Sequence, residues 1–229
     1  MIRKLGVVLI AVGGLLLAWV GVTVTWGDPA TSLYTRHEQH VLSKRLAEMD
    51  DQWRASGTAV AAAKSTGQSR RLTTAQLLRS RAARFERTVR DGSPIGWIVI
   101  PRLGLRMVVV EGTTASDLER GLGHYDTATG RDTSLPGMGG MVAIAGHRTT
   151  YLHPFLHIDS LRAGDPVELR TPYGRFEYRV TGHVVVDSSD WSILRPRAVE
   201  TLVLTACHPP HSASHRWVVF ARLASSHGL

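Results

Sequence analysis

The chain has a single cysteine, Cys207, whose position indicates a nucleophile. It ends the apolar run TLVLTAC and is followed at once by a His-Pro-Pro tripeptide, so we expect it at the tip of a strand beside a loop. A thiol that attacks a carbonyl needs a base or a cation to raise its thiolate fraction, and donors for the oxyanion. His147 at the end of another apolar run and Arg216 at the start of a third offer these groups. The sequence therefore predicts a site at three strand ends; a buried structural cysteine is the alternative.

The histidine-rich and acidic segments do not predict a metal site. His208, His211 and His215 have a ligand-like spacing, but two prolines place them in a loop, and there is no H-E-x-x-H sequence. Asp187 and Asp190 are too few ligands for a tight calcium site. A lone cysteine also excludes an intrachain disulfide and a cysteine-based zinc cluster. We therefore expect neither a metal nor a cofactor.

Residues 93–229 have the pattern of an all-β domain. Short runs rich in β-branched residues alternate with turn residues. Seven runs are candidate strands, of which the longest could bend or split into two: 97–103, 107–112, 141–146, 166–170, 175–186, 201–207 and 217–223. Only Ala115 to Leu122 and a short turn at Phe155 to Leu161 have helical character here. These patterns predict one all-β sandwich or barrel, large enough to bury a core without disulfides.

The N-terminal residues predict a membrane anchor. Residues 5–26 carry no charge, and as a helix at about 1.5 Å per residue they span about 33 Å, enough to cross a bilayer. Arg3 and Lys4 precede this run and Asp28 follows it, so the positive-inside bias leaves residues 1–4 in the cytoplasm and the rest outside. A cleaved signal peptide is the alternative, but this run exceeds the roughly 7–15 apolar residues of such peptides and no A-x-A site follows.

Residues 27–92 are expected to form a basic, partly helical extracellular stalk. Apolar positions recur at helical spacing over 31–56, a low-complexity break follows at 57–67, and 71–90 are again helical in pattern. The chain has 27 Lys and Arg against 19 acidic residues, a net charge of +8, and most of the excess lies in this stalk. Export excludes nucleic acid as the partner. Anionic headgroups or wall polymers could attract the charge, but we favour a solvated spacer.

Two motifs resemble those of the sortases, the membrane-anchored cysteine transpeptidases of Gram-positive cell envelopes. The run LTACHPPHSASHRWVVFARL (204–223) resembles their nucleophile strand, and AIAGHR (143–148) resembles their histidine motif. The resemblance extends from about Gly96 to Leu223. Within the family, the segments GHY at 123–125 and AGHRTTY at 145–151 are similar to class E, the housekeeping type of high-GC actinobacteria. The resemblance implies an eight-stranded β-barrel with short helices.

The resemblance also implies a role for each residue of the predicted site. Cys207 would attack the Thr–Gly carbonyl of an LAxTG- or LPxTG-like sorting signal and form a thioester. His147 would protonate the leaving amine and later deprotonate the incoming one, and Arg216 would hold the oxyanion. The implied partners are surface proteins that carry a C-terminal sorting signal, an amine of the peptidoglycan precursor, and the membrane.

Two further residues are implicated in substrate binding. Tyr125 lies where class E sortases are thought to read the sorting motif, which implies a preference for LAxTG over LPxTG. Sortases usually carry Thr immediately before the cysteine, where this chain has Ala206. Strand alternation points Thr205 to the same side as Cys207 and Ala206 to the opposite face, so we expect Thr205 to contact the substrate.

Two other functions are compatible with these features. A pilus-assembling sortase would use a lysine of a pilin as the acceptor, although no Asp-Pro-Trp-like lid motif is present in the stalk. A non-catalytic extracellular binding module would engage anionic polymer through the stalk and merely bury Cys207.

Overall fold

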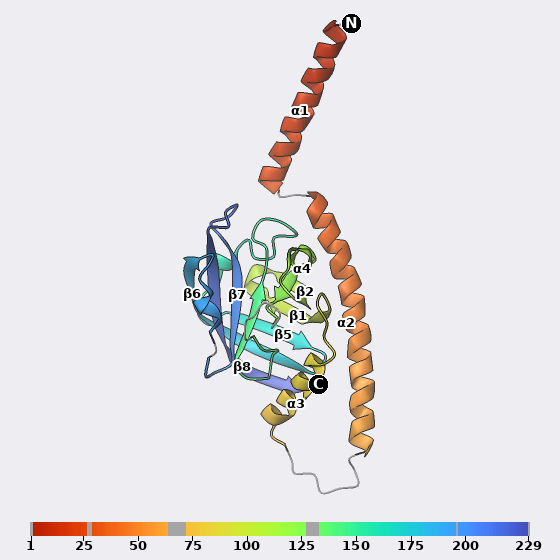
Figure 1. Ribbon diagram of the computed structural model, residues 1–229, viewed down its shortest axis with the longest axis vertical. Coiled ribbons are helices and arrows are strands. Elements are labelled where there is room, and N and C mark those ends of the chain that lie inside the picture. Colours follow the sequence, from red (N-terminus) through yellow and green to blue (C-terminus); the bar gives the residue numbers. More distant parts are fainter. Residues whose placement is uncertain (1, 27–28, 64–71, 127–132, 196, 229) are drawn as a thin grey trace.

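The computed structural model describes residues 2–26, 29–63, 72–126, 133–195 and 197–228. Three helices precede a β-barrel (Figure 1): α1 (Ile2–Trp26), α2 (Pro29–Ala63) and α3 (Thr74–Glu86). Within α1, the stretch Arg3–Gly21 is long and apolar enough to cross a membrane. A low-complexity break was expected at residues 57–67. This prediction is wrong for residues 57–63, because α2 continues through this alanine-rich stretch and alanine is the strongest helix former. Residues 64–67 lie outside the described residues.

Eight strands close into a barrel in the order β1-β2-β3-β4-β7-β8-β6-β5. Neighbouring strands are antiparallel except for the parallel pairs β2–β3 and β4–β7. The strands are β1 (Pro94–Ile100), β2 (Leu105–Glu111), β3 (Leu122–His124), β4 (Met141–Ala145), β5 (Pro166–Thr171), β6 (Gly174–Asp187), β7 (Thr201–His208) and β8 (His215–Gly228). The eight-stranded barrel expected from the family resemblance is therefore confirmed.

The eighth strand is not the one that the sequence pattern indicated. The long run 175–186 stays one strand, β6, and accommodates its curvature with two register shifts against β8. The additional strand is β3, at the end of the segment expected to be helical, because helix α4 (Ala115–Glu119) ends three residues earlier than predicted. β3 contains Gly123, where a Cβ atom would lie 2.2 Å from the Gly112 carbonyl oxygen. The close backbone approach requires a glycine, and this residue also weakens the strand signal.

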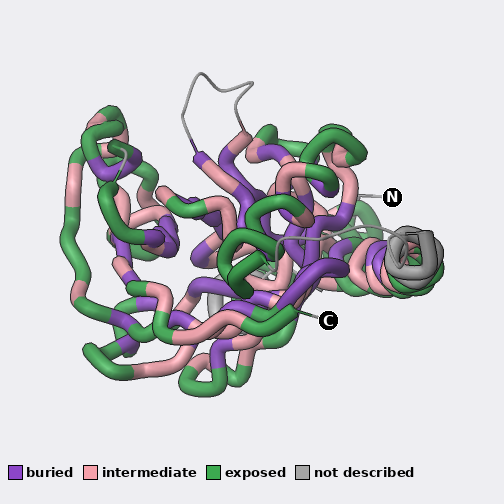
Figure 2. The backbone as a smooth tube through the Cα atoms, turned by 90° about the horizontal axis from the view of Figure 1, so that it is seen from below, coloured by how far each residue is buried: buried purple, intermediate pink, exposed green. Residues whose placement is uncertain are grey.

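Side chains alternate between the barrel interior and its outer surface along β7. Leu202, Leu204 and Ala206 belong to the main core. Val203 belongs to a second buried cluster, which packs against the 3-10 helix η4 (Trp191–Leu194). Figure 2 shows the buried segments gathered within the barrel, with exposed segments on the surrounding loops. The predicted alternation places Thr205 and Cys207 on the face of β7 opposite to Ala206.

Both α2 and α3 pack against the barrel. Leu42 and Leu46 of α2 are buried against Val108 and Val110 on the outer face of β2. α3 begins with a capping box, in which Thr73 and Gln76 exchange hydrogen bonds. Three of its residues enter the main core: Leu78, Ala82 and Phe85. The described helices of the predicted stalk therefore contribute buried surface to the barrel.

The contact of α2 with β2 gives a stability prediction. Leu46→Ala is expected to lower the free energy of unfolding by about 2–5 kcal/mol, because Leu46 is 1% exposed and truncation leaves a cavity against β2. Denaturant unfolding of the full chain in micelles measures the change. The matched control is Leu33→Ala on the same helix, where the side chain is 67% exposed. Equal stability of the two variants would show that α2 does not stabilise the barrel.

A buried carboxylate fixes β4 relative to β7. Glu200, immediately before β7, accepts hydrogen bonds from the backbone N–H groups of Gly137 (3.0 Å) and Gly139 (3.0 Å), which precede β4, and from the Tyr178 hydroxyl (2.7 Å). Both glycines have positive φ, +85° and +78°, a conformation that glycine adopts without strain. The glycine-rich segment thus binds an internal carboxylate at the point where the two parallel strands begin.

Candidate functional site

The strand register brings Cys207, His147 and Arg216 to one end of the barrel. In the parallel pair β4–β7, Ala145 lies opposite Thr205. His147 and Cys207 each lie two residues beyond this pair, at the same end of the two strands. In the antiparallel pair β7–β8, Cys207 lies directly opposite Arg216. Cross-strand partners present their side chains on the same face of the sheet. Three segments far apart in the chain therefore present a thiol, an imidazole and a guanidinium at one mouth of the barrel.

His147 lies in a half-buried position that disfavours its charged form. Burial lowers the pKa of the His147 imidazole below its ordinary value, while the negative charge of Glu119 acts in the opposite direction. The ring of Tyr151 packs against the imidazole, with centroids 5.0 Å apart and ring planes inclined by 32°. The Cys207 thiol is partly exposed and forms no disulfide. A free, partly exposed thiol at the same barrel mouth as a half-buried imidazole is an arrangement that can support nucleophilic catalysis.

Arg216 forms hydrogen bonds with the β7–β8 turn. Its Nη1 atom donates to the carbonyl oxygens of Ala213 (3.0 Å) and His215 (3.1 Å). Within the described residues, these hydrogen bonds leave Nε and Nη2 as further donors of the guanidinium group. The turn therefore supports Arg216 from one side while its remaining donors can serve a ligand beside Cys207.

Arg148, for which the sequence predicts no role, is buried beside the site. Its side chain is 2% exposed and forms an ion pair of 2.7 Å with Asp159. Nη1 donates to His208 Nδ1 (2.8 Å) and to the Cys207 carbonyl oxygen (3.4 Å). Because a guanidinium only donates hydrogen bonds, His208 accepts at Nδ1. Arg148 therefore connects the loop after β4, which carries His147, to the end of β7.

Tyr125 and Thr205, the two predicted substrate-binding residues, contact each other. The Tyr125 hydroxyl lies 3.0 Å from Thr205 Oγ1, and the two residues are 8% and 2% exposed. They lie on the outer face of β4 and β7, under η4. Ala206 is packed in the barrel interior. A hydroxyl at position 206 would thus point into the core, so its absence removes no polar group from the face that carries Cys207.

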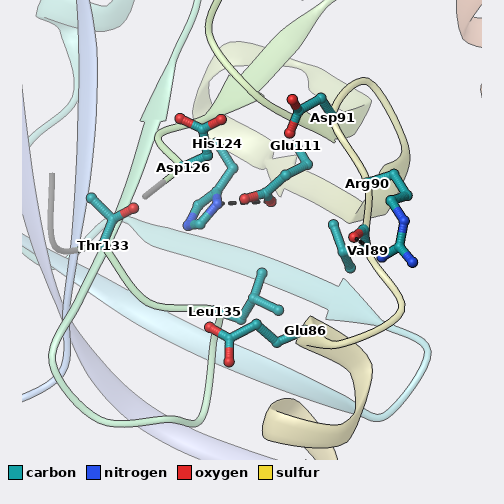
Figure 3. A pocket seen from close by; sticks show the side chains of 9 residues that line it. All are labelled: Glu86, Val89, Arg90, Asp91, Glu111, His124, Asp126, Thr133 and Leu135. Atoms are coloured by element: carbon teal, nitrogen blue, oxygen red, sulfur yellow. Dashed lines mark hydrogen bonds and ion pairs between the residues drawn. The ribbon is translucent and has the colours of Figure 1, made fainter. Parts of the chain in front are cut away.

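A polar cavity lies elsewhere, beside α3 and the loop that joins α3 to β1 (Figure 3). It has a volume of about 160 Å³, and its lining includes Glu86, Asp91 and the Glu111–His124 pair. His124 Nδ1 lies 3.0 Å from Glu111 Oε2, and the histidine is 2% exposed. None of the three residues of the predicted catalytic site lines this cavity.

No metal cluster is present in the described part of the chain, where no group of three or more His, Cys, Asp or Glu side chains lies close enough to hold an ion. Two of the histidines with ligand-like spacing have other partners. His208 is bound to Arg148, and His215 Nδ1 lies 2.8 Å from Ser214 Oγ.

Known proteins resemble this chain in sequence and in structure. "Sortase D" of Bacillus subtilis is 33% identical over 135 residues, which cover 57% of this chain and 64% of that protein. "Sortase SrtE1" of Streptomyces coelicolor is 30% identical over 144 residues, which cover 58% of this chain and 41% of that protein. The matched region thus spans less than two thirds of either relative. Sortase E from Streptomyces avermitilis superimposes with a TM-score of 0.54 at 36% identity, covering 61% of this chain and 93% of that structure.

The match to a whole protein family includes all three residues at the barrel mouth. The family model of the Sortase domain matches residues 98–224, more than half of the chain. This region includes His147, Cys207 and Arg216, together with the complete strands β2 to β7 and parts of β1 and β8. The chain therefore belongs to the sortase family of cysteine transpeptidases.

Proposed function

We propose that this chain is a membrane-anchored sortase of the class E type, which joins proteins with a C-terminal sorting signal to an amine of the peptidoglycan precursor. The observation that carries the proposal is the register of β4, β7 and β8, which aligns His147, Cys207 and Arg216 at one barrel mouth. Sortase E from Streptomyces avermitilis, at 36% identity, supports the class. A sortase E1 structure from Streptomyces coelicolor, 28% identical over 60% of this chain, holds a tripeptide in its active site.

In the proposed first half-reaction, Cys207 becomes acylated. The thiolate attacks the carbonyl carbon between Thr and Gly of the sorting signal, and a C–S bond forms. Arg216 and backbone N–H groups hold the oxyanion of the tetrahedral intermediate. As the intermediate collapses, the C–N bond breaks and His147 transfers its proton to the leaving glycine amine. The product is a thioester between Cys207 and the threonine carbonyl.

In the second half-reaction, the thioester reacts with an amine. Neutral His147 accepts a proton from the incoming amine, whose nitrogen forms the new amide bond while the C–S bond breaks. The Cys207 thiolate and the protonated His147 are thereby restored. No cofactor is needed, because the energy of the cleaved amide is conserved in the thioester.

The proposed binding site for the sorting signal lies beside Cys207, next to the outer face of β4 and β7 that η4 covers. Apolar residues of this face form a buried cluster with η4 and Tyr125: Met141, Ala143, Ala145, Ile193, Leu194, Val203 and Val218. The Tyr125–Thr205 contact lies two residues before the nucleophile on the same face. An extended peptide bound beside this covered face would bring its scissile carbonyl to Cys207.

The proposed location is the outer surface of the cell membrane. α1 provides the single span, with its N-terminus in the cytoplasm and the barrel outside.

A transpeptidation assay with the full chain in micelles tests the proposal. LAxTG and LPxTG peptides are offered with triglycine, a diaminopimelate-type amine or a lysine side chain, and products are identified by mass spectrometry. We expect ligation to the first two acceptors and a preference for LAxTG. Faster ligation to the lysine side chain than to the other two acceptors would show that the chain is a pilus-assembling sortase. An absence of cleavage with every peptide would contradict the proposal.

The contact between Tyr125 and Thr205 predicts a specificity effect. Tyr125→Phe is expected to reduce the ratio of kcat/KM for LAxTG over LPxTG by about 2- to 10-fold, the effect of one lost hydrogen bond. Competition between the two peptides in one reaction measures this ratio directly. Tyr34→Phe, at an exposed position of α2, is the matched control. An unchanged ratio in both variants would limit Tyr125 to a packing role.

A further inference from the structure

The loop that follows His147 holds a strained backbone against the imidazole. Tyr151, Leu152 and His153 have φ values of 51°, 64° and 38°, which are unusual for consecutive residues other than glycine. Hydrogen bonds within the loop maintain this conformation, including Phe155 N–H to the His147 carbonyl oxygen (3.1 Å). Phe155 itself is fully buried in the core. Strain of this kind persists only where the surroundings enforce it, and it concentrates at functional sites. Here it presents the ring of Tyr151 to His147.

The hydroxyl of Tyr151 connects this loop to α4. It donates a hydrogen bond of 3.1 Å to Glu119 Oε1, at the last residue of the helix. The backbone carbonyl of Glu119 accepts a hydrogen bond of 2.7 Å from Thr35 of α2, which is completely buried. The next residue, Arg120, pairs with Glu38 of α2 at 3.0 Å. The contacts with α2 therefore fix the backbone at Glu119, while the Glu119 carboxylate accepts the hydrogen bond from Tyr151.

We propose that Tyr151 and Glu119 are positioning residues for His147, which orient its ring and favour its protonated form. The proposal rests on the proposed function for its catalytic consequence. A histidine that works with a nucleophile is commonly oriented by a third group. In this chain the ring of Tyr151 is the group that orients His147. Glu119 in turn holds Tyr151 through the hydrogen bond from the tyrosine hydroxyl.

The physical basis is the electrostatics of the tilted ring pair, whose centroids lie 5.0 Å apart. An imidazolium within about 6 Å of an aromatic centroid is attracted by the ring's negative face. Donation of the phenol hydrogen to a carboxylate increases the electron density of that ring, and the carboxylate itself raises the pKa of His147 against the effect of burial. Both effects favour the protonated imidazole that the proposed acylation step requires. Tyr151 faces the His147 ring from its own loop, and Glu119 of α4 acts on it through its charge. Arg148, the next residue, is paired with Asp159, and the strand register places Cys207 of β7 and Arg216 of β8 at the same barrel mouth.

The test compares Glu119→Gln and Tyr151→Leu in the full chain in micelles. The titration of His147 is followed by NMR of its C2–H proton, assigned with His147→Gln. The rate of iodoacetamide alkylation is followed against pH, and Cys207 is the chain's only thiol. We expect both variants to titrate His147 at lower pH than the wild type. We also expect kcat for sorting-peptide cleavage to fall about 10-fold, with KM changed less than about 2-fold, because misorientation affects the reacting groups more than peptide binding.

Matched variants separate positioning from a merely structural effect. Glu48→Gln and Tyr34→Phe, both at exposed positions of α2, should leave all three measurements unchanged. Tyr151→Phe retains the stacked ring and loses the link to Glu119, so its titration should lie between those of Tyr151→Leu and the wild type. If Tyr151→Leu does not fold, Glu119→Gln still decides the question. The proposal is overturned if folded Glu119→Gln titrates His147 as the wild type does. A wild-type chain that cleaves no sorting peptide would instead contradict the proposed function, because the titration needs no substrate.

Discussion

Replacing Cys207 by alanine is expected to abolish both cleavage of a sorting peptide and formation of a covalent adduct with it. The thiol is the only one in the chain, and it is partly exposed at the barrel mouth, opposite Arg216. Without it no acyl-enzyme forms, and we expect kcat to fall by at least about 10⁴-fold, as for loss of a nucleophile in other covalent enzymes. Intact-mass spectrometry in the absence of an acceptor amine measures the adduct, and hydroxylamine should release it as expected for a thioester.

Peptide binding provides the control for this prediction. Cys207→Ala should bind an uncleaved LAxTG peptide with a Kd within about 3-fold of the wild-type value, because it removes one sulfur and keeps the Tyr125–Thr205 face. Cleavage by Cys207→Ala at a measurable fraction of the wild-type rate would remove the cysteine from the mechanism.

Replacing His147 by glutamine is expected to lower kcat/KM by about 10²- to 10⁴-fold, the range for loss of a general acid and base. Glutamine can still form hydrogen bonds but cannot exchange a proton at these pH values. His157→Gln, on an exposed residue of the same loop, is the matched control and should retain wild-type kinetics. Equal kinetics of the two variants would contradict the proposed role of His147.

The pH dependence of the wild type follows from the environment of His147. Acylation needs the thiolate together with the imidazolium. Burial lowers the pKa of His147, so the imidazolium is lost at lower pH than for an exposed histidine, although Glu119 opposes this effect. Only a minority of molecules then carry both the thiolate and the imidazolium at neutral pH, which predicts slow turnover. It also predicts a bell-shaped pH profile of acylation, whose two apparent pKa values belong to the coupled Cys207–His147 pair and to neither residue alone. A flat profile of acylation between about pH 5 and about pH 10 would exclude His147 from the step.

The strands that could be predicted are those with a repeated pattern of β-branched residues. Seven runs of this kind correspond to seven strands of the barrel. β3 was missed because it is only three residues long and contains Gly123, whose role is a close backbone approach. Barrel closure came from the family resemblance, since the runs alone allowed either a sandwich or a barrel. The docking of α2 was also missed, because its apolar positions do not reveal that their partners are Val108 and Val110.

The site was predictable where strand ends carry the chemistry, and not where loops do. Cys207, His147 and Arg216 each lie at or just beyond the end of a recognisable strand, and strand pairing decides their approach. Tyr151 belongs to the motif that the resemblance rests on, but its contact with His147 depends on three left-handed residues. Glu119 ends α4, and its carbonyl oxygen accepts a hydrogen bond from Thr35 of α2. Such contacts between distant loops leave no periodic signal in a sequence.

The hydrogen bond between Thr35 and Glu119 also bears on which way the barrel mouth faces in the proposed membrane arrangement. Thr35 follows Trp26, the last residue of α1, by nine positions, a chain length that reaches at most about 30 Å. β8 runs from Arg216 at the barrel mouth to its far end beside α3 (Figure 1). With α1 in the bilayer as proposed, the mouth is held close to the lipid surface and the opposite pole points toward the wall. Under the proposed function, a sorting signal and a peptidoglycan precursor that arrive at the membrane surface would then meet the thioester there.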